Sequence, residues 1–162
     1  MNFGVSPCNM AFSRALDALV AAAIAIAVSL IAVVAGHPQL LSYVVIASAV
    51  LIGICALLRS KPFFLSGSCL ALCTANFVYF VTAGSTTDTN SSGFVVMFAV
   101  ISTGCGLLGA VIAALLLRRY VSAGPILSLL VGFAGVSVGF FSSQLIICNS
   151  VMWCGPLSFP LK

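Results

Sequence analysis

The sequence predicts an all-α integral membrane protein, folded as a compact antiparallel bundle of about five transmembrane helices. Three observations support this class. Of the 162 residues, 62% are hydrophobic, and the mean hydropathy is +1.30. Only 5% are charged, whereas a soluble domain carries about 25%. So few charges cannot cover a water-facing surface, which excludes a soluble globular enzyme, and the high hydrophobicity excludes a disordered chain.

Five apolar runs have the length of about 20 residues that a helix needs to cross the hydrocarbon core of a bilayer. We therefore expect a single transmembrane domain over residues 1–162, with a tail after the last span. The predicted spans are residues 15–35, 40–58, 63–82, 94–117 and 125–147, and the tail is 148–162.

Each span is bounded by residues that stop a membrane helix. The first ends at a Gly-His-Pro sequence, residues 36–38, and the second at the basic segment 59–62. A polar stretch, residues 84–93, separates the third span from the fourth. Arg118 and Arg119 close the fourth span, and Pro125 suits the first turn of the fifth helix.

The pattern within the runs favours helices over strands. The runs are continuously apolar, whereas a transmembrane barrel needs segments of about 10 residues with alternating hydrophobicity. A helix also satisfies its own backbone hydrogen bonds in lipid. Since most connections between the runs are short, we expect neighbouring helices to pack antiparallel.

The basic residues predict the orientation of the bundle. With the N-terminus in the cytoplasm, every Lys and Arg beside a loop falls on the cytoplasmic side, as the positive-inside rule requires. An odd number of spans then places the C-terminus outside. Because these residues are scattered, they do not form a nucleic-acid-binding patch. The basic residues predicted on the cytoplasmic side are Arg14, Arg59, Lys61, Arg118 and Arg119, and Lys162 is predicted on the opposite side of the membrane.

Small residues recur at helical spacing along each span. Because lipid tails are as apolar as Leu, helices in a membrane associate where small residues let their backbones approach. We interpret these stripes as the contacts that seat the helices against one another. A sharper hypothesis is that the fifth span also presents its glycines to a partner helix. The residues of this helix-packing or partner face are Gly132, Gly135, Gly139, Gly106 and Gly109.

Asn76 is the most polar side chain in the middle of a span. An unpaired amide in hydrocarbon is unfavourable by several kcal/mol, so we expect Asn76 to face the bundle interior. An interhelical hydrogen bond is one interpretation. A pore or a substrate contact is the other, and Ser66, Ser102 and Thr103 would then line the same polar interior.

Two further polar residues lie near the ends of spans. Asp17 lies one turn into the first span and three residues after Arg14, a spacing that places the two side chains side by side on a helix. We therefore predict an Arg14–Asp17 pair. Gln144 lies near the outer end of the fifth span, and we expect it to reach the membrane interface.

Little in the chain supports catalysis or metal binding. There is one His and there are two Asp or Glu residues, which leaves almost nothing for acid–base chemistry, so we expect no enzyme, no cofactor and no metal site. Cys148 and Cys154 both follow the fifth span. They form either a structural disulfide, if the helix ends near Cys148, or two free thiols.

These observations predict a binding protein. We expect a small polytopic membrane protein that recognises another integral membrane protein, or a membrane-inserting toxin, through its helices within the lipid bilayer. An immunity-type factor and an accessory subunit of a complex both fit, and the compact loops favour a bacterial inner membrane. A small transporter or channel for a neutral solute is the alternative. A thiol-redox protein that uses Cys148 and Cys154 is a second alternative.

Overall fold

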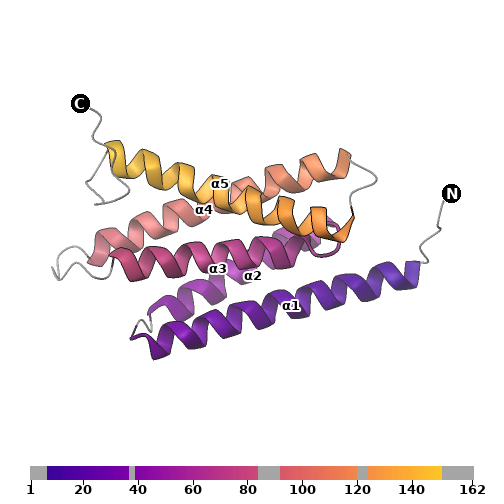
Figure 1. The fold of residues 1–162 in the computed structure, drawn as a ribbon, viewed down its shortest axis with the longest axis horizontal. Helices are drawn as coiled ribbons and strands as arrows, with labels where there is room; N and C mark the ends of the chain where they lie inside the picture. Colours follow the sequence, from indigo (N-terminus) through magenta and orange to yellow (C-terminus); the bar gives the residue numbers. More distant parts are fainter. Residues whose placement is uncertain (1–6, 37–38, 84–91, 120–123, 151–162) are drawn as a thin grey trace.

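The computed structural model describes residues 7–36, 39–83, 92–119 and 124–150. In these ranges the regular secondary structure is all α-helix, and successive helices run in opposite directions along the bundle (Figure 1). The helices are α1 (Pro7–Val34), α2 (Gln39–Leu57), α3 (Phe64–Ala83), α4 (Ser92–Arg119) and α5 (Pro125–Ser150).

The helices begin and end close to the predicted spans, with one clear difference. Helix α1 begins at Pro7, whereas the apolar run begins at residue 15. Proline is well suited to the first helical turn, and the residues between Pro7 and the apolar run continue the helix although they are too polar to belong to the run. Helix α1 ends where Gly36 adopts a left-handed φ of 85° and its amide bonds to the Val33 carbonyl at 3.1 Å.

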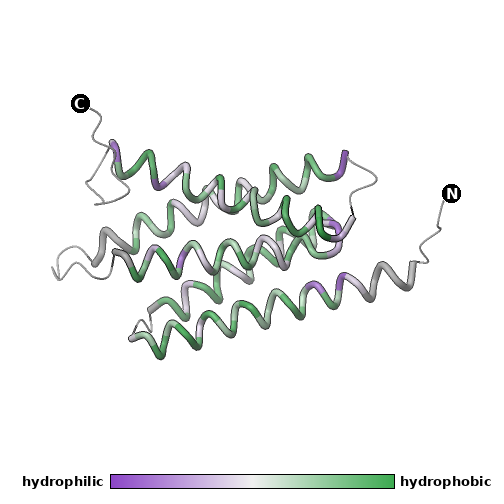
Figure 2. Tube along the Cα trace, viewed as in Figure 1, coloured by the Kyte–Doolittle hydropathy of each residue, from purple (hydrophilic) through white to green (hydrophobic). Residues whose placement is uncertain are grey.

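All five helices of the described ranges are long and apolar enough to cross a membrane. Hydrophobic residues cover most of each helix, and many hydrophilic residues lie near helix ends (Figure 2). The outward faces also carry large apolar side chains: Leu19 is 68% exposed and Ile26 is 60% exposed. This surface is compatible with a multi-pass membrane protein, because lipid accepts apolar side chains that water would not.

Helix α3 is the centre of the bundle. It packs against each of the other four described helices, whereas α1 contacts α2 and α3. Of the apolar window of α3, 67% is buried inside the protein, against 28% in α1. Helix α3 is therefore the one described helix that contacts all the others, and its residues Ser66, Ser68 and Asn76 are buried.

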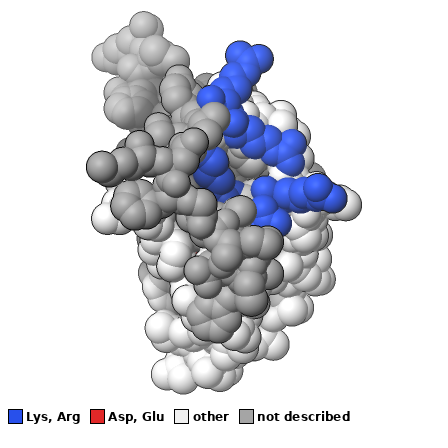
Figure 3. Space-filling model, turned by 90° about the vertical axis from the view of Figure 1, so that its right-hand side faces the viewer, with Lys and Arg blue, Asp and Glu red and all other residues white. Residues whose placement is uncertain are grey.

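The described basic residues gather at one end of the bundle, where α1 and α3 begin, α2 and α4 end, and α5 begins (Figures 1 and 3). This arrangement follows from the antiparallel helices, which bring the segments around residues 14, 60 and 119 to the same end. We call it the basic end. It consists of Arg14, Arg59, Lys61, Arg118 and Arg119.

Candidate functional site: the α4–α5 groove and the buried polar cluster

Glycines bring α4 and α5 into backbone contact. A Cβ atom added to Gly109 would overlap the carbonyl group of Gly135, and one added to Gly139 would overlap the carbonyl group of Cys105. A Cβ added to Gly135 would lie 2.5 Å from the Cβ of Ala113, which is also an overlap. The two helices can therefore approach this closely only because these positions lack side chains.

Two other predicted glycines have different surroundings. Gly132 faces α3, where an added Cβ would overlap the Phe64 carbonyl and lie 2.8 Å from the Ser68 hydroxyl. Gly106 lies beside Val136 at ordinary van der Waals distance, with the nearest atom 3.4 Å from an added Cβ. The α3–α5 contact also depends on Gly67, which sequence reasoning did not single out and which faces the backbone of Leu129.

The close approach of α4 and α5 leaves an open groove on the outer face of the bundle, with a volume of about 470 Å³. Its rims carry exposed apolar side chains such as Leu108, Ile112 and Val138. We call it the α4–α5 groove. Its lining is Cys105, Leu108, Gly109, Ile112, Ala113, Leu116, Val131, Ala134, Gly135, Val138, Gly139 and Ser142.

A buried polar cluster joins α3, α4 and α5 away from the basic end. The Thr103 hydroxyl donates to the Asn76 side-chain oxygen at 3.2 Å, and the Asn76 amide donates to the Leu72 carbonyl at 2.9 Å. Ser102 accepts a hydrogen bond from the Gln144 amide at 2.7 Å and lies 3.3 Å from the Ser143 hydroxyl. Thr103 of α4 thus pairs with Asn76 of α3, and Ser102 of α4 pairs with Gln144 of α5.

Gln144 contradicts the prediction that it reaches the membrane interface. Its side chain is only 1% exposed, because α5 turns it inward toward Ser102. The hydrogen bond supplies the polar partner that water would have offered at the interface.

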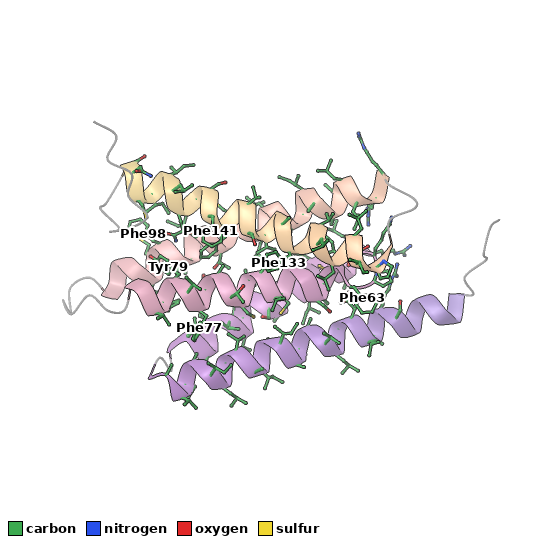
Figure 4. The ribbon with its side chains drawn as sticks, in the orientation of Figure 1. Phe63, Phe77, Tyr79, Phe98, Phe133 and Phe141 are labelled. Carbon is green, nitrogen blue, oxygen red and sulfur yellow. The ribbon has the colours of Figure 1, made fainter. Side chains whose placement is uncertain are left out.

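Aromatic side chains pack beside this cluster. Tyr79 of α3 makes edge-to-face contact with Phe140 of α5, at 6.4 Å between ring centroids. Tyr43 of α2 donates from its hydroxyl to the Ala99 carbonyl of α4 at 2.7 Å, and its ring lies 6.0 Å from that of Phe80. Tyr79 and Phe98 lie at the same end of the bundle, and Phe63 lies at the basic end (Figure 4).

Ser66 does not join the polar cluster. It lies at the start of α3, where its backbone amide donates to the Asp17 carboxylate at 2.9 Å and its hydroxyl donates to the same carboxylate. The Leu65 amide also donates to this carboxylate, at 3.2 Å. Asp17 is 3% exposed and caps the N-terminus of α3 from a different helix.

This arrangement changes the interpretation of Asp17. Sequence reasoning paired it with Arg14, its neighbour on the same helix, but its hydrogen bonds go to a residue pair almost 50 positions later in the chain. The signal that could have revealed this role is that the start of α3 has no capping residue of its own. Lys61, Pro62 and Phe63 precede it, and none of them is a residue that normally caps a helix N-terminus.

Two of the described cysteines, Cys69 and Cys73, lie close together on α3. Cys69 donates to the Ala21 carbonyl at 3.3 Å and lies 3.9 Å from the sulfur of Cys73, and both thiols are free and buried. Within the described residues, no group of three or more His, Cys, Asp or Glu side chains is placed to hold a metal ion. Cys148 is disulfide-bonded, and Cys154 lies outside the described residues, so the pairing of Cys148 with Cys154 stays a prediction.

Comparison with known proteins places the chain in no family. No family model, no curated protein and no solved structure matches it. The function must therefore be argued from the groove, the polar cluster and the distribution of charge.

Proposed function

We propose that the chain inserts into a membrane and acts, without catalysis, by binding another integral membrane protein or a membrane-inserting toxin through the α4–α5 groove. The observation that carries this proposal is the groove itself. Gly109, Gly135 and Gly139 contribute to its lining, and exposed apolar side chains form its rims. In lipid, where burial of Leu offers little driving force, such a shape favours the close approach of another helix.

Two roles fit a protein of this kind. An immunity-type factor would bind a membrane-inserting toxin, and an accessory subunit would bind a larger membrane complex. Both need a helix surface of defined shape and neither needs catalytic groups. The compact connections between the helices favour the bacterial inner membrane as the location.

The orientation that we propose has the basic end in the cytoplasm. Its support is the gathering of all five described Lys and Arg residues at this end, in agreement with the positive-inside rule. A Ser60→Cys reporter, with the native cysteines replaced, tests it with a thiol reagent that does not cross membranes. Labelling only after the cytoplasmic side is opened is the expected result. Labelling of intact cells from outside would reverse the orientation.

A pair of matched substitutions tests the groove. Val138 lies in the groove and is 65% exposed, and Ile146 lies on the same helix outside the groove and is 66% exposed. Val138→Phe should fill the groove and reduce co-purification of a membrane partner from mild detergent by about tenfold, the equivalent of 1.4 kcal/mol. Ile146→Phe adds a ring of the same size outside the groove and should leave co-purification unchanged. Equal behaviour of the two variants would remove the groove from the binding site.

The polar cluster favours a second candidate function, a transporter or channel for a neutral solute. Asn76, Ser102 and Thr103 would line its path, and they already bond to one another or to neighbours. A Thr103→Cys variant tests this function. Modification by a small, water-soluble thiol reagent would support a path, and protection from the reagent in the folded protein would argue against it.

A further inference from the structure

A second hollow lies at the basic end, between α1, the end of α2 and the start of α3. Its volume is about 280 Å³, just below the range of about 300–1,000 Å³ that is usual for small-molecule sites. Arg14 comes from α1 and Arg59 follows α2, and Ile52, Ala56 and Leu65 supply apolar lining. The hollow therefore combines two guanidinium groups with an apolar wall, at a place that the α4–α5 groove does not reach. We call it the Arg14–Arg59 pocket.

The carboxylate that lines this pocket already accepts hydrogen bonds from α3. Asp17 is the one acidic residue among the described ranges, and its carboxylate accepts hydrogen bonds from the Leu65 and Ser66 amides and from the Ser66 hydroxyl. Such bonds direct its oxygen atoms toward α3. A single carboxylate also cannot balance the five cations of the basic end. Both arginines of the pocket are exposed, so their guanidinium groups are accessible to an anion from outside the chain.

The backbone holds Arg59 at the pocket in an unusual way. Helix α2 ends in a Schellman motif, with the Ser60 amide bonded to the Cys55 carbonyl and the Arg59 amide bonded to the Ala56 carbonyl, both at 3.1 Å. The left-handed position of this motif is usually Gly, but here it is Arg59, with a φ of 46°. The turn thus places a guanidinium side chain on the pocket lining where most helices would place no side chain.

We propose that the Arg14–Arg59 pocket binds a phosphate-bearing anion, with the two guanidinium groups as its ligands. Arginine suits this role because its planar fork matches two phosphate oxygens and stays charged at every physiological pH. Basic pockets between helices on the cytoplasmic side of a membrane bind lipid head groups in this way. The phosphate is supplied either by an anionic lipid, whose acyl chain would lie along the apolar wall, or by a soluble phosphate compound.

Two double variants with the same charge change test the proposal. Arg14→Gln with Arg59→Gln removes the ligands of the pocket, and Arg118→Gln with Arg119→Gln removes two cations of the basic end outside the pocket lining. Native mass spectrometry of the purified full chain in detergent measures binding of phosphatidylglycerol, with phosphatidylcholine, a zwitterion without net charge, as the comparison. The first variant should bind phosphatidylglycerol about tenfold more weakly, because charge-assisted hydrogen bonds are lost. The second should bind it like the wild type.

Two further experiments identify the source of the phosphate and distinguish binding in the pocket from a general effect of positive charge. Inorganic phosphate at millimolar concentration should not displace phosphatidylglycerol if the ligand is a lipid, and displacement would assign the pocket to soluble phosphate. Ile52→Trp fills the pocket without a change of charge and should weaken binding as the first double variant does.

Three results would overturn the proposal. They are equal losses in the two double variants, equal binding of the two lipids, and unchanged binding in Ile52→Trp. Val138→Phe in the α4–α5 groove should not affect lipid binding, so failure here and failure of the proposed partner binding can be told apart.

Discussion

The contact between α1 and α3 and the contact between α4 and α5 join helices by different physical means. In the first, Asp17 of α1 accepts hydrogen bonds from the first turn of α3, and the Cys69 thiol of α3 donates to the Ala21 carbonyl. In the second, Gly109 and Gly135 let two backbones meet. Directional polar bonds therefore dominate one contact, and close packing dominates the other.

The difference shows that one chain can hold its helices together by two kinds of interaction. Burial of apolar surface drives helices together in water, but in the membrane that we propose for this chain it offers little, so other interactions must supply the association. The polar contact is specific because it satisfies backbone amides that would otherwise be orphaned at the start of α3. The packed contact is close, and its small residues leave a hollow on the outer face. This hollow is the α4–α5 groove, which makes α4 and α5 the better candidates for partner binding.

The largest expected effect comes from breaking the polar contact. Asp17→Ala leaves the Leu65 and Ser66 amides without their shared acceptor, so the free energy of unfolding should fall by about 3 kcal/mol. Unfolding in mixed micelles, followed by circular dichroism, measures it. Arg14→Ala removes the neighbour that the sequence suggested and should change stability by less than about 0.5 kcal/mol. A large loss in Arg14→Ala would restore the local pair as the main role of Asp17.

A smaller effect should follow from breaking the packed contact. Gly109→Ala places a methyl group against the Gly135 carbonyl and should destabilise the protein by about 1–3 kcal/mol, because the helices must move apart. Gly104→Ala lies on the same helix with no atom within 4 Å of the added Cβ, and the better helix former should leave stability equal or slightly raised. Thermal unfolding compares the two, and the same sign for both would show that close approach is not what Gly109 provides.

The buried polar cluster should show the smallest coupling. A double-mutant cycle of Asn76→Ala and Thr103→Val should give a coupling energy of about 0.6 kcal/mol and not above about 1.7 kcal/mol, the range of side-chain hydrogen bonds between membrane helices. Thr74→Val is the matched control, because the Thr74 hydroxyl bonds within its own helix to the Leu70 carbonyl at 2.7 Å. If the coupling energy between Asn76 and Thr74 were as large as that between Asn76 and Thr103, the interhelical hydrogen bond would make no specific contribution to stability.

The positions of the helices could be predicted from the sequence because length and hydropathy act locally. The runs at residues 40–58 and 125–147 differ from α2 and α5 by three residues or fewer at each end. The start of α1 could not be predicted this way, because the residues after Pro7 are helical without being strongly apolar. Hydropathy reports where a helix can cross lipid, and it does not report where the helix begins.

The partners of polar side chains were harder to predict than the helices. Helical spacing suggests neighbours on the same helix, and so it paired Asp17 with Arg14 and grouped Ser66 with Asn76. The structure instead pairs Asp17 with Ser66, because the antiparallel order brings the start of α3 beside α1. Gln144 was placed at the interface from its position near a helix end, although the side of the helix on which it lies decides its burial. Such contacts depend on helix rotation and on neighbours that spacing alone does not reveal.

The proposed function depends most on the α4–α5 groove being covered by another helix. A photoreactive phenylalanine analogue at Val138 tests it in cells, with the same analogue at Ile146 as the control of equal exposure on the same helix. If a helix covers the groove, position 138 should give a discrete protein adduct that Ser142→Phe in the groove abolishes, and position 146 should give lipid adducts alone. Lipid adducts alone from both positions would contradict the proposed function.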